Sequence, residues 1–89
     1  MNNMNLNVKS AVAIAMDYVR SLEDLLPASG LRLEETILED NGNWLITLSY
    51  DEPGKFDERS YKILEVDPKQ KEVLSMRIRM LGNFDGGKF

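Results

Sequence analysis

The sequence contains no cysteine and no histidine among its 89 residues. Without them the chain has no disulfide, no thiolate nucleophile, no imidazole base and none of the usual nitrogen or sulfur ligands for a metal. It also lacks a Gly-x-Ser-x-Gly elbow and a phosphate-binding glycine loop, so no serine stands in a recognisable activating motif. We therefore expect a non-enzymatic protein with no catalytic residues, no metal site and no cofactor.

Long apolar runs are absent as well. The apolar run from Ala11 to Met16 ends at Asp17, so no segment approaches the length of a membrane span. The segment Met1 to Asn7 is neutral and rich in asparagine, unlike the basic start of a secretory signal. These features favour a cytoplasmic location and no contact with a membrane.

Basic residues are outnumbered. Eleven Lys and Arg stand against fifteen Asp and Glu, which gives a formal net charge of −4. Nucleic-acid binding depends on clustered Lys and Arg that meet the phosphates, and here the basic residues are scattered. We expect no nucleic-acid partner.

The segment Leu6 to Leu26 has the periodicity of an amphipathic helix. Asn5, Asn7 or Ser10 would cap its start, and Pro27 with Gly30 would end it near Leu26. Its apolar residues recur at steps of three and four, which predicts one buried stripe: Val8, Ala11, Val12, Ala15, Tyr18, Val19, Leu22, Leu25 and Leu26.

Beyond Gly30 the pattern becomes alternating, and Asn41-Gly42 is the strongest turn signal in the chain. A two-residue loop there predicts a hairpin of residues 31–40 and 43–51 in which Asp40 pairs with Asn43. On the side facing the helix this register pairs Ile37 with Ile46, Leu33 with Tyr50 and Glu39 with Trp44. On the other side it pairs Leu38 with Leu45, Thr36 with Thr47 and Arg32 with Asp51. It also places Glu35 opposite Leu48 on the buried side, where an unpaired carboxylate is costly.

Two further strands are expected at residues 60–66 and 72–80, joined by a polar turn around Pro68. In the last strand Leu74, Met76, Ile78 and Met80 would point inward, with Ser75, Arg77 and Arg79 outward. In the third strand either Tyr61 with Ile63 or Leu64 with Val66 could be the buried set, and a bulge would reconcile the two.

The predicted architecture is α+β, with one N-terminal amphipathic helix packed on one face of a four-stranded antiparallel meander sheet. Residues 1–81 form a single domain, and residues 82–89 form a tail that we expect to be flexible unless Phe84 or Phe89 docks.

The segments Tyr61-Lys62-Ile63-Leu64-Glu65-Val66-Asp67 and Glu72-Val73-Leu74, placed after a helix and a meander of strands, resemble PepSY-type domains. The wider cystatin-like architecture is similar too. The resemblance covers most of the chain between Val8 and Arg79 and implies an interaction or inhibitory module. Two features depart from it: PepSY-type domains usually follow a signal or anchor, and their last turn commonly carries glycine where this chain has Lys71. The turn at residues 40–43 lacks the Gln-x-Val-x-Gly loop of protease-inhibiting cystatins.

Acidic clusters are the remaining polar feature. Paired carboxylates can support acid/base chemistry or hold a hard cation, but most of these residues fall in predicted turns and none has the spacing of a calcium loop. We interpret them first as ordinary carboxylates exposed to solvent. The alternative hypothesis is a shallow small-ligand or carboxylate-based enzymatic site between helix and sheet, formed by Glu35, Trp44 and Tyr50.

The leading hypothesis concerns the sheet face away from the helix. One helix covers one side of a sheet, so the other side meets solvent or a partner. We expect a protein partner, or a second copy in a homodimer, to dock there or along an edge strand. The predicted docking residues are Thr36, Leu38, Leu45, Thr47, Arg77 and Arg79.

Overall fold

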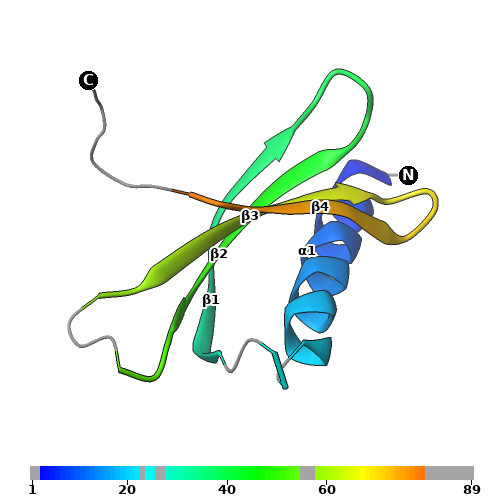
Figure 1. The fold of residues 1–89 in the computed structure, drawn as a ribbon. Helices are drawn as coiled ribbons and strands as arrows, with labels where there is room; N and C mark the ends of the chain where they lie inside the picture. The colour runs from blue at the N-terminus through cyan, green and yellow to red at the C-terminus, as the bar shows by residue number, and fades with distance from the viewer. Residues whose placement is uncertain (1–2, 23, 26–27, 55–57, 80–89) are drawn as a thin grey trace.

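An N-terminal helix and a four-stranded antiparallel sheet make up the fold, seen in a computed structural model that describes residues 3–22, 24–25, 28–54 and 58–79 (Figure 1). The helix is α1 (Asn3–Ser21), and the strands are β1 (Ser29–Leu38), β2 (Trp44–Asp51), β3 (Ser60–Asp67) and β4 (Glu72–Ile78). The strands lie in chain order, β1-β2-β3-β4, and each pairs antiparallel with the next. The predicted α+β meander is confirmed. Met80 and the predicted tail, residues 82–89, lie outside the described residues.

The helix begins and ends earlier than its sequence pattern predicts. It starts at Asn3, so the predicted caps lie inside it. It ends at Ser21 because the chain then tightens into turns with three-residue spacing, where the Leu22 amide donates to the Val19 carbonyl (3.0 Å) and the Leu25 amide to the Leu22 carbonyl (2.8 Å). The expected end at Leu26 is therefore wrong, and Leu25 is 85% exposed instead of buried.

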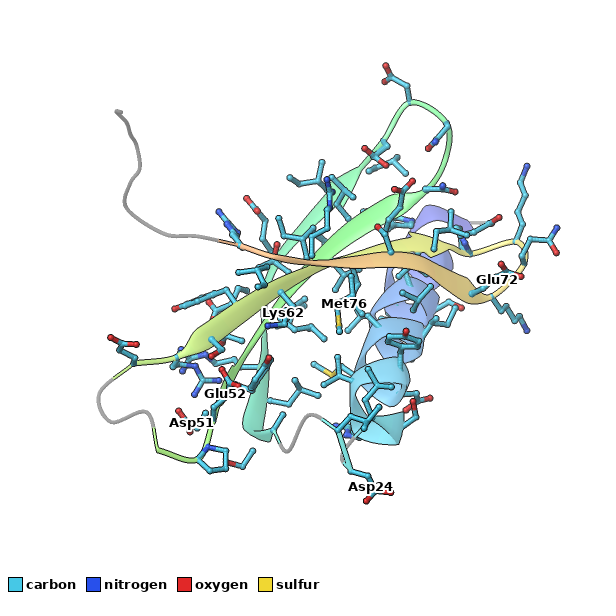
Figure 2. All side chains as sticks on the ribbon, viewed as in Figure 1. Asp24, Asp51, Glu52, Lys62, Glu72 and Met76 are labelled. Carbon is cyan, nitrogen blue, oxygen red and sulfur yellow. The ribbon has the colours of Figure 1, made fainter. Side chains whose placement is uncertain are left out.

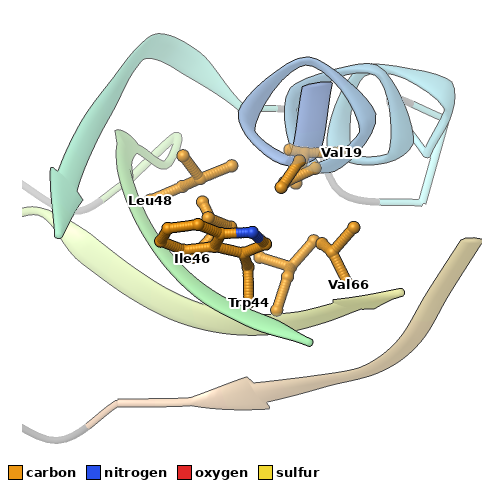
Figure 3. Packing of buried hydrophobic residues seen from close by; sticks show 8 residues of the cluster. Val19, Trp44, Ile46, Leu48 and Val66 are labelled. Atoms are coloured by element: carbon orange, nitrogen blue, oxygen red, sulfur yellow. The ribbon is translucent and has the colours of Figure 1, made fainter. Parts of the chain in front are cut away.

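The core lies between α1 and the middle of the sheet. Trp44, Ile46 and Leu48 of β2 point toward the helix, with Val19 above them and Val66 beside them (Figure 3). Ala11 and Ala15 are fully buried at the contact, and their small side chains let the helix axis approach the sheet closely. Met76 of β4 also lies on the side of the sheet that faces α1 (Figure 2).

The hairpin between β1 and β2 has a three-residue loop, which corrects the predicted register. The Gly42 amide donates to the Glu39 carbonyl (2.9 Å) and the Glu39 amide to the Asn43 carbonyl (2.8 Å). Gly42 has a φ of 91°, the left-handed position that follows a tight turn in this loop type. The pairs are therefore Leu38 with Trp44, Ile37 with Leu45, Thr36 with Ile46 and Glu35 with Thr47.

This shift of one residue exchanges the two sides of β1 near the turn, because side chains alternate along a strand. Thr36 and Leu38 lie on the helix side, and Glu35 and Ile37 lie on the opposite side, which we call the open side. Glu34 is an extra residue in β1, a bulge that shifts the alternation of side chains by one position. Leu33 therefore pairs with Leu48 and lies on the helix side, as the sequence predicted. Glu35 thereby leaves the core side on which the two-residue loop had placed it.

The second half of the sheet settles the choice left open for the third strand. Leu64 and Val66 are fully buried, and β2 and β3 pair without a register shift, so the bulge is not in β3. It lies in β4 instead, where Leu74 is the extra residue and is 49% exposed. Leu74 was expected inward, but Val73 takes that place opposite Val66.

Candidate functional site

The six predicted docking residues do not share one side of the sheet. Leu45, Thr47 and Arg77 lie on the open side, and so does Arg79, whose guanidinium reaches Thr47. Thr36 and Leu38 pair with the core residues Ile46 and Trp44 and lie on the helix side. The prediction that these residues form a single surface is therefore wrong, because it depended on the two-residue loop.

The centre of the open side is covered by the chain's own polar side chains. Ser49 is fully buried there, although α1, the helix of the described residues, packs on the other side of the sheet. Its hydroxyl donates to Glu34 Oε2 (2.6 Å) and accepts from Arg59 Nε (2.9 Å). Arg59 also donates to Asp51 (3.3 Å) and to the carbonyl of Gly30, and so ties β1 to β2.

A second bridge lies next to the first. Arg79 Nη1 donates to Glu35 Oε1 (3.0 Å) and to Thr47 Oγ1 (3.3 Å), and Thr47 is 2% exposed. Glu34 and Glu35 of β1 are thus both held in ion pairs, Glu34 with Arg32 and Glu35 with Arg79. The hydrogen bond from Ser49, followed by that from Arg32, lowers the pKa of Glu34 below its ordinary value. These partnered carboxylates suit a structural clamp better than acid/base chemistry.

The alternative site at Glu35, Trp44 and Tyr50 is not assembled. Glu35 lies on the open side, while Trp44 and Tyr50 lie on the helix side of β2. Tyr50 is fully buried, and Lys62 Nζ lies 5.7 Å from the centre of its ring. Trp44 Nε1 and the Tyr50 hydroxyl find no hydrogen-bond partner among the described residues, yet neither borders either of the two hollows described below.

Exposed apolar side chains lie on both edge strands of the described sheet: Leu74 and Ile78 on β4, and three on β1. Leu33 is 41% exposed, and Ile37 and Leu38 are each 45% exposed. Within the described part of the chain β1 pairs only with β2, so its outer edge has no strand beside it. Backbone groups in an antiparallel ladder alternate between facing the partner and facing away. Because the Glu39 amide bonds to Asn43, the amides and carbonyls of Leu38 and Thr36 point outward from β2.

A groove of about 480 Å³ runs between α1 and the exposed side chain of Leu33. Its floor is apolar and is made largely by Val8, Val12 and Met16. The groove exists because α1 contacts all four strands but β1 the least, so the helix leaves the β1 margin partly uncovered. Lys9, Ala13, Asp17 and Arg20 complete the lining.

Sequence reasoning missed this surface because it placed Leu33 opposite Tyr50, fully under the helix. The available signal was the pair of alanines, Ala11 and Ala15, which mark the line of closest helix contact. Val12 and Met16 lie on one flank of that line and face the groove beside β1.

A second hollow of similar volume lies on the other flank of the helix, between Ile14, Asp17 and Tyr18 on one side and Lys71 of the β3-β4 turn with Glu72 and Val73 of β4 on the other. Its lining is more polar and carries charges of both signs. It lies at the start of β4, the other edge strand of the described sheet, where the extra residue Leu74 interrupts the regular pairing with β3.

The described residues contain no group of three or more Asp or Glu side chains placed to share a metal ion. Within the described part of the chain, no helix is apolar over enough residues to cross a membrane. The chain matches no protein-family model, and no curated protein or solved structure shows significant similarity to it.

Proposed function

We propose that this chain is a non-enzymatic protein-interaction module that binds an extended segment of another protein along β1. The observation that carries the proposal is the coincidence of three features at one place. These are exposed apolar side chains on β1, outward backbone groups at Thr36 and Leu38, and the apolar groove beside Leu33.

An extended segment of a partner can bind as an additional strand at the edge of a sheet, and the three features of β1 suit this mode of binding. Main-chain hydrogen bonds to the outward amides and carbonyls supply affinity, and pockets for alternate side chains supply specificity. A long edge with exposed apolar side chains is otherwise a liability, since it invites pairing with any extended chain. The two register shifts in β1 limit that liability and leave residues 35–38 as a short regular segment.

The PepSY-type resemblance implies the same class of function, an interaction or inhibitory module. The cytoplasmic location expected from the sequence stays a prediction. The open side, the docking surface favoured by the sequence, is less suitable because Thr47 and Ser49 are already covered by arginine and glutamate side chains.

A selection of random twelve-residue peptides displayed on phage tests the proposal. The matched variants are Leu33→Gln at the groove and Leu74→Gln on the β4 edge, where both leucines are exposed and lie at a bulge. We expect enriched peptides to bind wild type and Leu74→Gln alike, and Leu33→Gln at least roughly tenfold more weakly, which corresponds to about 1.4 kcal/mol. No enrichment, or equal binding to Leu33→Gln, would show that the β1 edge is not the docking site.

A further inference from the structure

We infer that the segment docking on β1 alternates apolar and basic side chains, with the apolar ones over the groove and the basic ones on the open side. This inference rests on the proposed function, since it names the chemistry of the partner that the β1 edge accepts.

The helix side of the edge selects apolar side chains. A strand added beside β1 lies about 4.8 Å away, and every second side chain points toward α1. Those side chains would lie between Leu33 and Leu38 of β1 and the groove floor at Val12 and Met16. Burial of apolar surface there is favourable, whereas a polar side chain would lose its solvation without gaining a partner on the apolar floor.

The open side of the same edge is acidic. Glu35 and Glu39 flank Ile37 on that side, and Asp40 follows in the turn. Glu35 is 44% exposed and shares one oxygen with Arg79, while Glu39 and Asp40 form no ion pair with any described residue. Opposite charges on neighbouring strands stabilise a pair, so Lys or Arg on the added strand is favoured here.

The same charges disfavour a second copy of this chain as the occupant. When Ile37 lies on the two-fold axis, the outward groups of Thr36 pair with those of Leu38 in the second copy, and the groups of both residues are bonded. That register sets Glu35 of one copy directly opposite Glu39 of the other, twice per dimer, on the same side of the joined sheet. Like charges directly opposite each other are destabilising, and the net charge of −4 on each chain adds to the repulsion.

Three fluorescent nonapeptides test the inference by anisotropy. The first alternates valine with lysine, the second carries glutamate in place of lysine, and the third has the composition of the first with valines and lysines in separate blocks. Wild type is compared with Glu39→Lys at the site and with Glu72→Lys, an exposed and distant control on β4.

We expect the alternating lysine peptide to bind wild type roughly tenfold more tightly than either of the others, and to weaken as salt rises from about 50 to 300 mM. Glu39→Lys should weaken binding of that peptide roughly three- to fivefold and favour the glutamate peptide, since the variant replaces an attraction between neighbouring strands with a repulsion. Glu72→Lys should change neither.

Equal binding of the lysine and glutamate peptides, or of the alternating and block peptides, would overturn the inference. So would a wild-type dimer in sedimentation that dissociates in Leu33→Gln, because the occupant would then be a second copy. If the peptides enriched in the display selection contain no excess of Lys and Arg, this inference is wrong, but the proposed function still holds. If no peptide binds in a way that depends on Leu33, both this inference and the proposed function are wrong.

Discussion

At the scale of single residues, Lys71 holds an unusual backbone conformation. Its φ of 58° lies in the left-handed region, where a side chain with a Cβ is disfavoured. The turn around it is fixed by Asp67, whose Oδ1 accepts from the amides of Lys69 (2.9 Å) and Gln70 (3.2 Å). Lys71 therefore carries backbone strain in an otherwise well-bonded turn.

Replacing this lysine with glycine should stabilise the fold. The left-handed penalty of about 1 to 2 kcal/mol disappears, and the added freedom of glycine in the unfolded chain takes back part of it, which leaves a net gain of roughly 0.5 to 1 kcal/mol. Urea unfolding of Lys71→Gly and wild type measures the difference. An unchanged or lower midpoint would mean that the turn is not strained.

Ser49 affects the protonation of a neighbouring carboxylate, Glu34. Its hydrogen bond is the largest cause of the lowered pKa of Glu34, with Arg32 second. A carboxylate whose pKa is lowered in the folded state adds stability above its unfolded pKa, and this stability is lost as the pH falls through the folded pKa. The clamp on the open side should therefore weaken in acid.

In Ser49→Ala the loss of stability between about pH 5 and pH 3 should be shallower than in wild type, because the largest cause of the lowered pKa of Glu34 is gone while Arg32 remains. Urea unfolding at several pH values gives the slope. Ser75→Ala, which changes another serine on the open side, should leave the slope as it is. Parallel acid limbs in wild type and Ser49→Ala would contradict the role given to this hydroxyl.

At the scale of elements, contact between α1 and the sheet depends on small side chains. Ala11 and Ala15 are fully buried against the sheet, while Ala13 is exposed on the helix. Overpacking a well-filled core costs typically 1 to 3 kcal/mol.

We expect Ala15→Leu to lower the free energy of unfolding by about that amount, roughly 1 to 3 kcal/mol, since the helix must move outward or leucine must take a poor rotamer. Ala13→Leu makes the same chemical change on an exposed position and should cost roughly 0.5 kcal/mol or less. Thermal unfolding midpoints of the two variants and wild type measure this difference in stability. Equal midpoints would mean that the helix does not pack where the structure places it.

The elements also show what could be predicted from sequence. Helical spacing and alternation identify α1 and all four strands, since these patterns depend on which side of each element is buried. The length of the β1-β2 loop was not predictable, because Asn-Gly suits both two- and three-residue turns. The choice appears only in the backbone, where Asn41 has no positive φ and Glu39 bonds to Asn43. The one additional residue in the loop moved Thr36 and Leu38 to the helix side and Glu35 and Ile37 to the open side.

The candidate site was predicted less well than the fold for the same reason. Docking along an edge strand was one of the expected routes, but the open side was favoured. The covering of that side depends on bridges such as Arg79 to Glu35, which join residues 44 positions apart and leave no local pattern. The groove depends on where the helix lies across the sheet, which periodicity does not give.

At the scale of the whole molecule, the two sides of the sheet and its two edges differ. One side is buried under α1, and the centre of the other is closed by arginine, glutamate and serine side chains. The β1 edge joins apolar exposure, an adjacent groove and outward backbone groups. We therefore propose that recognition takes place at an edge of the sheet and not on a face.

Backbone amide hydrogen exchange, followed by NMR with and without the tightest peptide from the display selection, tests this assignment most directly. In the free chain the amides of Thr36 and Leu38 should exchange fast and those of Glu35 and Ile37 slowly, because alternate groups face β2. Saturating peptide should slow Thr36 and Leu38 at least roughly tenfold. Unchanged exchange at these two amides, with new protection on β4 or none at all, would contradict the account.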